Sequence, residues 1–484
     1  MQYIKGWVKI GAGLLSAMAM AFGATAAEHA PAKPAAAKKS HAAAKKPAAA
    51  KSAKSAKSAP AQRAAAVPPD PSGPFEIQVW HALNPEEAGE FDSLVQRFNE
   101  QGHGFTVKVV ASPSQQELIS QGLAAVRAKR PPHLIEISDN HSPEFIAQHG
   151  AILPLYELLA KYPIRDLRWF LPQTTASMRD AKGNLLALPW MTEIPIYLYN
   201  RDLYQKAGLN PDAPPRTWRE MQTHLVALQQ SGVSCPYATS DQSWIHIENL
   251  AALHNVALAT KNNGLDGSGA LLMTNDLLHV RHLALMMSWV RSTLFPVRSA
   301  GDQADLQFAS GDCAVLTSGS SALATVQAKA HFSYGVAPLP YYDEEASRPS
   351  NPFVGGSSFW ALGGHSVAEQ KAVAQFIAYL ASPVVAAEWH QKTGFLPLTE
   401  AAFRASDVSY YKNLPGAEAV ISAMSNPPGK FTRGFRLSHY DAVSRILDEE
   451  LDDVWSGRKP PKQGLDDAVA RANALIAPPA AARK

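Results

Sequence analysis

The feature that most constrains the fold is a strand, helix, strand, helix, strand order near the start of the folded chain. Residues 75–80 alternate between apolar and polar side chains as a strand does, and apolar side chains recur at helical spacing over residues 88–98. The same pattern predicts a strand at 105–110, a helix at 115–127 and a strand at 134–137. Because a helix between two strands returns the chain in the same direction, this order predicts a parallel sheet in an α/β fold.

Polar and aromatic residues follow the ends of these three predicted strands. Trp80 and His81 end the first strand, residues 112–115 follow the second, and residues 138–141 follow the third. Ligands of open α/β sheets bind beyond the carboxyl ends of the strands. We therefore expect these residues to lie together at a ligand site.

Chain length and a second series of signals predict another lobe. About 410 residues follow residue 72, which exceeds the limit of about 250 to 300 residues for a single hydrophobic core. Helices should begin at capping boxes that start with Thr217 and Ser366, and a strand with two prolines at 186–200 suits a crossing between lobes. With a strand at 311–318 returning toward the first lobe and another crossing at 355–360, three crossings form a hinged clamp. The expected boundaries are 73–192 and 319–360 for lobe 1, and 193–318 and 361–480 for lobe 2.

The first 72 residues have the features of targeting and linking segments. Residues 1–27 combine Lys5 and Lys9 with an apolar run and small residues, which is typical of a cleaved secretory signal. Residues 28–72 consist mostly of Ala, Lys, Pro and Ser, so we expect a disordered tether. Nine Lys and Arg against two acidic residues give the tether a net charge of +7, whereas residues 73–484 carry −6. This distribution argues against nucleic-acid binding by the folded part, and a solvated spacer is a simpler role for the tether than contact with a membrane or cell wall.

Common catalytic and metal-binding motifs are absent from the sequence. It contains no GxSxG, HExxH, paired CxxC or GxxxxGK pattern. Its 16 histidines are scattered, so hydrogen-bonding roles are expected rather than metal ligation. We therefore predict no enzyme, no cofactor and no metal. Cys235 and Cys313 are the only cysteines, and either a disulfide bond or two buried free thiols fits them in an oxidising compartment.

The tract at residues 388–399 is the most specific motif. It ends a predicted helix at a glycine, then continues with an aromatic residue and a proline-stiffened extended segment. This tract and other blocks resemble the periplasmic glycerol-3-phosphate-binding proteins of ATP-binding-cassette importers, within extracellular solute-binding protein family 1. The resemblance covers residues 75–475, and its blocks are WHALNPEEAGEFDSLVQRFN, SWIHIENLAALHNVALATKNNGLDG, GDCAVLTSGSSAL, FSYGVAPLPYYD, AAEWHQKTGFLPLT and ILDEELDDVWSGRKPPKQGLDDAVARAN.

The resemblance implies a two-lobed periplasmic-binding-protein clamp of the maltose-binding-protein-like type II class, with three interlobe crossings. Such a protein captures a small polar solute in the interlobe cleft. It delivers the solute to an inner-membrane ABC permease made of two membrane subunits and an ATPase. The resemblance further implies a periplasmic monomer with no nucleic-acid partner. Both cysteines fall where the family has them.

The resemblance also implies ligand-binding positions, most of which are altered in this chain. The family's cleft residues fall on Gln115, Asp139, Glu193, Asp241, and Gly319 with Ser318 and Ser320 alongside. Gly356 is the only unaltered position, the family's tyrosine falls on Phe395, and its late arginine falls one residue before Arg445. The complete set of candidate ligand-binding residues is Trp80, His81, Gln115, Asp139, Glu193, Asp241, Trp244, Ser318, Gly319, Ser320, Gly356, Phe395, Arg436 and Arg445.

Two carboxylates in this set bear on the ligand. A carboxylate about 5 Å from a phosphate, at an effective dielectric constant of about 20, costs about 3 kcal/mol, which is more than about a hundredfold in affinity. Glu193 and Asp241 therefore disfavour a phosphate monoester, unless they only line the cleft or pair with Arg436 or Arg445. They suit sugar hydroxyls, as does the glutamate of maltose-binding relatives in the same Pro-x-x-x-Glu position. They also suit the cationic head group of a glycerophosphodiester facing an aromatic ring.

The leading hypothesis for the function is capture of glycerol-3-phosphate or of a glycerophosphodiester such as glycerophosphocholine. The first alternative is the same clamp binding a neutral sugar or oligosaccharide. An alternative of another class is a periplasmic enzyme or chaperone-like protein built on this fold.

Overall fold

The computed structural model describes residues 68–139, 151–164, 178–180, 182–296, 302–423 and 429–477. The expected signal and the expected tether before residue 68 lie outside the described residues. So do residues 140 and 141 of the expected ligand site and residues 478–480 of the expected second lobe.

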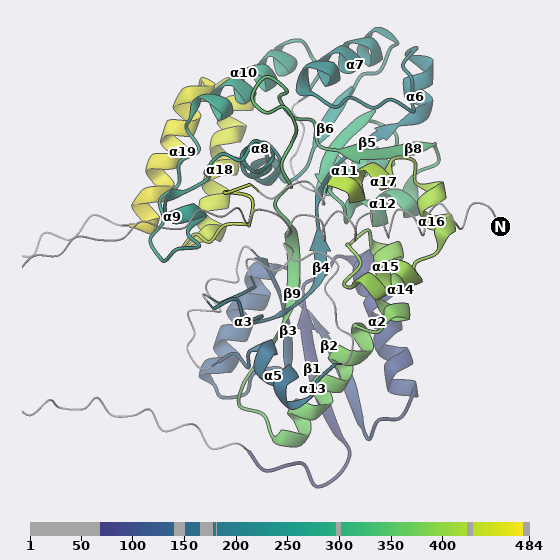
Figure 1. Cartoon of the computed structure of the whole chain (residues 1–484), viewed down its shortest axis with the longest axis vertical. Coiled ribbons are helices and arrows are strands. Elements are labelled where there is room, and N and C mark those ends of the chain that lie inside the picture. The colour runs from purple at the N-terminus through teal and green to yellow at the C-terminus, as the bar shows by residue number, and fades with distance from the viewer. Residues whose placement is uncertain are drawn as a thin grey trace, which may run out of the picture. The chain divides into compact units, whose positions relative to one another are not determined.

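The first unit, called lobe 1 below, is built on a five-stranded sheet with strand order β2-β1-β3-β9-β4 (Figure 1). Strands β1 (Phe75–His81), β2 (Phe105–Ala111) and β3 (Leu134–Ser138) pair in parallel, which confirms the predicted parallel sheet. Strand β9 (Gly355–Ala361) runs antiparallel between β3 and β4 (Leu188–Glu193). The helices of this unit are α2 (Pro85–Glu100), α3 (Gln115–Arg127), α5 (Leu155–Lys161), α13 (Val367–Leu380), α14 (Pro383–Thr393) and α15 (Glu400–Ala405).

The second unit, lobe 2, is built on a four-stranded sheet with strand order β6-β7-β5-β8. Strand β5 (Pro195–Asn200) runs antiparallel to β7 (Val315–Gly319) and β8 (Tyr334–Pro338), and β6 (Tyr237–Thr239) runs parallel to β7. Its helices before residue 300 are α6 (Arg201–Lys206), α7 (Trp218–Gln230), the π-helix η4 (Trp244–Glu248), α8 (Asn249–Leu253), α9 (Thr260–Asn263) and α10 (Leu277–Arg291). Those after residue 300 are α11 (Asp302–Ala309), α12 (Ala322–Lys329), α16 (Val408–Asn413), α17 (Ala417–Ala423), α18 (Tyr440–Trp455) and α19 (Pro461–Ile476).

Local sequence explains where several helices begin and end. At the start of α2 the Asn84 side chain accepts a hydrogen bond from the backbone N–H of Glu87, and the Glu87 side chain returns the interaction. The predicted capping boxes that start at Thr217 and Ser366 are also present, at α7 and α13. Helix α14 ends at Gly394, whose φ of 76° is the left-handed conformation that glycine adopts without strain.

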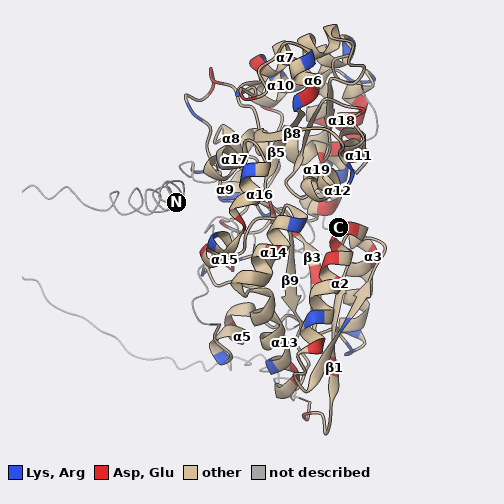
Figure 2. Cartoon of the chain, turned by 90° about the vertical axis from the view of Figure 1, so that its right-hand side faces the viewer, with Lys and Arg blue, Asp and Glu red and all other residues tan. Residues whose placement is uncertain are grey.

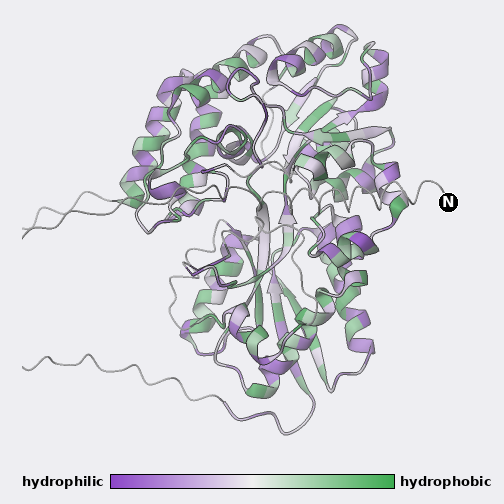
Figure 3. Cartoon of the chain, viewed as in Figure 1, coloured by the Kyte–Doolittle hydropathy of each residue, from purple (hydrophilic) through white to green (hydrophobic). Residues whose placement is uncertain are grey.

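Each sheet has its own hydrophobic core. The strands carry few charged residues (Figure 2), and apolar residues are frequent along them (Figure 3). The first core includes Phe91 and Phe98 of α2, and the second includes Trp218 and Trp289. The prediction that lobe 2 begins again at residue 361 is wrong, because α13 and α14 belong to the first core. The Phe376 ring of α13 lies 6.4 Å from that of Phe91 and 5.1 Å from that of Phe98.

The crossings between the lobes also differ from the prediction. The first crossing, from β4 to β5, is where the prolines indicated it, and β9 enters lobe 1 as expected. The predicted return at 311–318 is wrong, because β7 pairs with β5 and β6 and the chain then adds β8 to the same sheet. Residues 319–338 therefore belong to lobe 2 rather than lobe 1. The other passage described is between α15, which packs on α14, and α17, which packs on β8.

The two cysteines are joined in a disulfide bond. Cys235 precedes β6 and Cys313 precedes β7, and the backbone N–H of Ala314 donates to the carbonyl of Cys235 at 2.9 Å. Because these two strands are neighbours in the sheet, the bond joins chain segments that are 78 residues apart in sequence.

Among the described residues, no single helix combines the length and hydropathy needed to cross a membrane. The bent pair of α13 and α14 passes that test by length and composition alone. Its apolar side chains, among them Phe376, Ile377 and Trp389, are buried in the first core.

Candidate functional site

The candidate site lies where β4 passes into β5, at the junction between the two lobes. Glu193 is the last residue of β4, and its carboxylate accepts hydrogen bonds from the hydroxyl of Ser321 at 2.6 Å and from its backbone N–H at 3.4 Å. A Cβ atom on Gly319 would lie 2.2 Å from Oε2 of Glu193, so glycine at this position leaves room for the carboxylate. Burial and the negative charge of Asp241 raise the pKa of Glu193 to about 7.

Strand β9 contributes two glycines that lie against both lobes. Gly356 has a φ of 108°, and a Cβ there would lie 1.9 Å from the carbonyl oxygen of Met191 on β4. A Cβ on Gly355 would lie 2.9 Å from the indole ring of Trp244 in lobe 2. Glycine at position 356, a predicted ligand position, is therefore required by the close approach of two strands, and Trp244 lies beside Gly355 at the junction.

On the lobe 1 side, Gln115 is bonded to a buried glutamate. Its amide nitrogen donates to both carboxylate oxygens of Glu136 at 2.6 Å, and its oxygen accepts from the backbone N–H of Ser138 at 3.1 Å. Glu136 also accepts from the backbone N–H of Ala82 at 3.0 Å. Burial raises the pKa of Glu136 above its ordinary value. The ends of the three strands therefore meet as expected, since Glu136 of β3 contacts Ala82 after β1 and Gln115 after β2, and Gln115 contacts Ser138 at the end of β3.

A second buried glutamate comes from the first turn of α2. Glu87 is 7% exposed, and its carboxyl group takes part in the capping box with Asn84. Burial, together with the charge of Glu193, raises the pKa of Glu87 to about 8. The carboxyl groups of Glu193 and Glu87 are thus close enough for the charge of one to raise the pKa of the other.

The lobe 2 side contributes three further carboxyl groups. Asp241 adopts a left-handed φ of 43° before η4. Asp448 of α18 accepts from the backbone N–H of Ser243 at 3.2 Å, and Glu248 of η4 accepts from the Tyr440 hydroxyl. Burial, together with the negative charge of neighbouring carboxylates such as Asp241, raises the pKa of Asp448 to about 6 and that of Glu248 to about 8.

The electrostatic character of the junction is therefore acidic. Burial raises the pKa values of five carboxyl groups from both lobes, which are Glu87, Glu136, Glu193, Glu248 and Asp448. A site of this kind favours hydroxyl groups or an organic cation and disfavours an anion. The sequence prediction missed Glu87, Glu136, Glu248 and Asp448. Glu136 could have been identified from the sequence, because it is a charged residue within an otherwise apolar strand.

The remaining aromatic and histidine candidates are partly or wholly buried in lobe 1. Phe395 is 5% exposed, and its ring stacks on Trp389 at a centroid distance of 5.9 Å within the first core. The indole N–H of Trp80 donates to the Gln78 side chain at 3.2 Å. Nδ1 of the buried His81 accepts from the backbone N–H of Leu83 at 3.2 Å, and burial lowers the pKa of His81.

The serines and Asp139 lie at strand ends. The Ser318 hydroxyl accepts from Ser240 at 2.5 Å, within lobe 2. The backbone N–H of Ser320 donates to the carbonyl of Ile194 at 2.8 Å, beside the first crossing. Asp139 follows β3 and is partly buried.

The two arginine candidates have different positions. The Arg436 guanidinium donates to the backbone carbonyl of Arg179 at 2.7 Å and so links lobe 2 to the segment before β4. Arg445 lies on the exposed side of α18, with its side chain 55% exposed, and pairs with Asp441 at 3.0 Å. The structure therefore supports an interlobe role for Arg436 and gives Arg445 a partner on its own helix.

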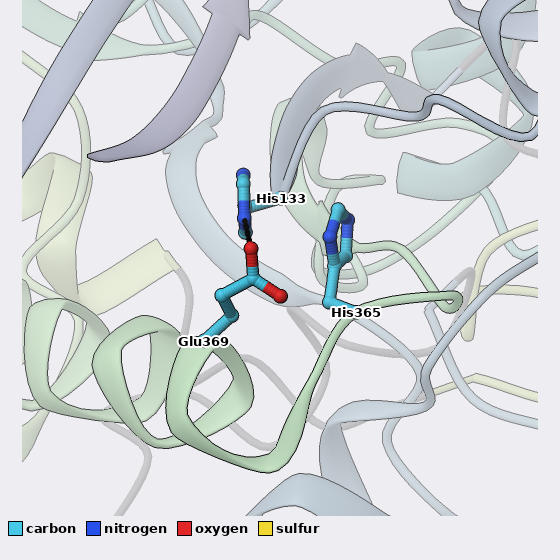
Figure 4. Close-up of side chains that lie close together, drawn as sticks. All are labelled: His133, His365 and Glu369. Atoms are coloured by element: carbon cyan, nitrogen blue, oxygen red, sulfur yellow. Dashed lines mark hydrogen bonds and ion pairs between the residues drawn. The ribbon is translucent and has the colours of Figure 1, made fainter. Parts of the chain in front are cut away.

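His133, His365 and Glu369 form the one group of potential metal ligands found among the described residues, with ligand atoms within 4.8 Å of one another (Figure 4). Nδ1 of His133 accepts the backbone N–H of Gln78 at 3.0 Å, so the proton of the neutral ring is on Nε2, which faces Glu369 at 3.4 Å. A protonated nitrogen does not bind a metal. The group therefore fits a hydrogen-bonded link between the start of β3 and α13 better than a metal site.

Comparisons with known proteins give a consistent result. Residues 93–416 match the family model described as bacterial extracellular solute-binding protein. The chain is 37% identical over 405 residues to the sn-glycerol-3-phosphate-binding periplasmic protein of Pectobacterium atrosepticum, covering 83% of this chain and 91% of the relative. It is 36% identical over 404 residues to the protein of the same name from Escherichia coli K12, covering 83% of this chain and 92% of the relative.

Two solved structures share the fold. UgpB from Mycobacterium tuberculosis in complex with glycerophosphocholine matches with a TM-score of 0.68 at 20% identity, over 84% of this chain and 98% of that chain. The cyclic alpha-maltosyl-1,6-maltose-binding protein of Arthrobacter globiformis matches with a TM-score of 0.65 at 21% identity, over 84% of this chain and 99% of that chain. These matches confirm the predicted type II clamp architecture.

Proposed function

Because the chain belongs to the bacterial extracellular solute-binding proteins, we propose that it captures glycerol-3-phosphate or a glycerophosphodiester, such as glycerophosphocholine, between its two lobes. The observation that carries the proposal is the extent of the similarity. Relatives named for glycerol-3-phosphate binding are 36% and 37% identical and align over at least 91% of their own length.

The proposed mechanism is enclosure of the solute as the lobes close. Polar groups from both lobes already meet at the junction, where the solute would replace water. Lys329 of α12 pairs with Glu86 of α2 at 3.0 Å, and Arg436 reaches the carbonyl of Arg179 at 2.7 Å. These two contacts join the lobes directly, so they would favour the closed arrangement.

The proposed setting is the periplasm, reached through the cleaved signal in residues 1–27. There the protein would act as a monomer and deliver its solute to an inner-membrane permease of two membrane subunits and an ATPase. The relatives are named as periplasmic binding proteins. A role in binding rather than catalysis agrees with those names, and the role needs no cofactor, metal or nucleic acid.

A neutral sugar is the second candidate ligand. The acidic junction favours it, since carboxylates accept hydrogen bonds from sugar hydroxyls without the repulsion that a phosphate would meet. A protein of the same fold from Arthrobacter globiformis is named for binding a cyclic maltosyl-maltose.

Titration calorimetry of the processed protein against glycerol-3-phosphate, glycerophosphocholine and maltose would test the proposal. We expect binding of at least one of the two glycerol phosphates with a stoichiometry of one, and none of maltose. Binding of maltose alone would overturn the proposal in favour of the sugar alternative. Genes for two permeases and an ATPase beside the gene for this protein would support the importer role.

A further inference from the structure

Glu136 places a carboxyl group in a strand that is otherwise apolar. It lies in β3, the central strand of the five-stranded sheet, and is 2% exposed. Its neighbours Ile135 and Ile137 are 0% exposed. Taking a carboxyl group out of water is unfavourable unless hydrogen bonds compensate for the loss. The role of Glu136 therefore follows from the hydrogen bonds that it accepts.

The hydrogen bonds of Glu136 connect three segments at strand ends. Its carboxyl group accepts the backbone N–H of Ala82, just after β1, at 3.0 Å. Both of its oxygens lie 2.6 Å from the amide nitrogen of Gln115, which begins α3 after β2. The oxygen of the same amide accepts the backbone N–H of Ser138, the last residue of β3, at 3.1 Å. One carboxyl group and one amide therefore fix the ends of β1, β2 and β3 relative to one another.

The residue types of this pair follow from the groups around it. The backbone N–H groups of Ala82 and Ser138 each need an acceptor, so an oxygen must face each of them. With a carboxylate at position 136, the nitrogen of Gln115 donates to it and the amide oxygen is left for Ser138. The pair of Glu136 and Gln115 therefore satisfies both backbone groups and each other.

The segments held by this pair are those where a solute would meet lobe 1. Ligands of open α/β sheets bind beyond the carboxyl ends of the parallel strands, which here are β1, β2 and β3. The segment after Ala82 also begins α2, because Asn84 caps that helix. In the first turn of α2, Glu86 pairs with Lys329 of lobe 2 at 3.0 Å. The position of Ala82 therefore affects both the solute-facing segments and an interlobe contact.

We propose that Glu136 is a positioning residue of the binding site, which acts through Gln115 and holds the lobe 1 half of the site in its binding arrangement. Groups that are already held in the bound arrangement lower the cost of ordering the site when the solute binds. Gln115, predicted from the sequence to contact the ligand, is then a link in this support, with its amide committed to Glu136 and Ser138. The inference rests on the proposed function for the identity of the solute alone.

A reciprocal exchange of the two side chains separates positioning from direct contact. In the double variant Gln115→Glu with Glu136→Gln, the new amide oxygen accepts the N–H of Ala82, and the new carboxylate accepts from Ser138 and from that amide. Each single variant instead brings like groups together. Glu136→Gln sets two amide nitrogens against each other, and Gln115→Glu sets two carboxylates against each other.

Two measurements report on these variants. Calorimetry with glycerol-3-phosphate, glycerophosphocholine and maltose gives the affinity. Hydrogen exchange, followed by NMR on the free protein, gives the protection of the backbone N–H groups of Ala82 and Ser138 without any solute. The matched control is Glu117→Gln, which removes an exposed carboxylate that accepts from the Gln121 amide on the same helix. Circular dichroism verifies that each variant is folded.

Each single variant should weaken the solute that the unmodified protein binds best by about tenfold, because a buried hydrogen bond between the strand ends is lost. The exchange of both N–H groups should become faster by a similar factor of about ten. The double variant should restore the affinity to within about threefold and should also restore the protection. Glu117→Gln should change neither the affinity nor the exchange.

Unchanged affinity in both single variants would overturn the proposal. A double variant with restored protection but without restored affinity would also overturn it, because Gln115 would then contact the solute directly. If Glu136→Gln did not fold, the comparison of Gln115→Glu with the double variant would give the same test. If maltose bound and neither glycerol phosphate did, the proposed function would fail, while hydrogen exchange and the affinity for maltose would still decide the role of Glu136.

Discussion

Substitutions at Gly356 and at two control glycines can separate two costs to stability, that of a left-handed backbone and that of a steric clash. Gly356→Ala places a side chain at a φ of 108° and puts its Cβ 1.9 Å from the carbonyl oxygen of Met191. Gly102→Ala provides the conformational effect alone, since Gly102 has a φ of 70° and nothing within 4 Å of the added atom. Gly89→Ala, inside α2, has neither problem.

The expected losses of stability follow from these geometries. A left-handed backbone costs a residue with a Cβ about 1 to 2 kcal/mol, so Gly102→Ala should lose that amount. Gly356→Ala should lose about 3 kcal/mol or more, since β9 and β4 must also separate, and forced overpacking costs about 1 to 3 kcal/mol. Gly89→Ala should gain about 0.5 to 1 kcal/mol, because alanine is the better helix former.

Urea unfolding followed by circular dichroism measures these free energies. Gly355, the neighbour of Gly356, pairs with Glu193 in the sheet, so Gly356→Ala should also weaken solute binding in calorimetry. Gly102→Ala should leave binding unchanged. If Gly356→Ala lost no more stability than Gly102→Ala, the contact with Met191 would be refuted as the reason for this glycine.

Three further predictions concern charge, cross-linking and closure. The pKa of Glu193 is raised from 4.5 to about 7, so its contribution to stability is complete below pH 4.5 and is lost as the pH rises through 7. The free energy of unfolding should therefore fall by up to about 2 kcal/mol over that pH range. Glu193→Gln should remove this part of the pH dependence. Replacing Cys235 and Cys313 with serine should lower the free energy of unfolding by about 2 to 4 kcal/mol, because the disulfide bond closes a loop with a sequence separation of 78. An unchanged midpoint of urea unfolding would contradict this. Lys329→Met removes the interlobe ion pair with Glu86. It should change the free energy of unfolding by less than about 1 kcal/mol but weaken solute affinity several-fold. A loss of stability with unchanged affinity would argue against a role of this pair in lobe closure.

The parts of the fold that depend on neighbouring residues in sequence were predictable. The capping boxes at Thr217 and Ser366 and the left-handed Gly394 are local interactions, and each was visible as a short pattern. The crossing at residues 186–200 was also visible, because its two prolines do not suit the centre of a sheet.

Strand partners and lobe membership were not predictable to the same extent. The pattern of β7 identifies a strand but not whether its neighbours are β5 and β6 or strands of the other sheet. The apolar face of α13 fits either core by composition, and contact with Phe91 and Phe98 decides between them. The same holds for Phe395, which was assigned to the ligand and stacks on Trp389 in the first core.

By itself, the sequence determined the α/β class, the two-lobed clamp and the family, because periodicity, caps and long motifs are properties of the chain. Only the tertiary structure brought Glu87, Glu136, Glu193, Glu248 and Asp448 to one junction from α2, β3, β4, η4 and α18. The pKa values of these carboxyl groups depend on burial and on one another's charge, and both arise only when distant segments fold together. The electrostatic preference of the site is therefore a property of the fold.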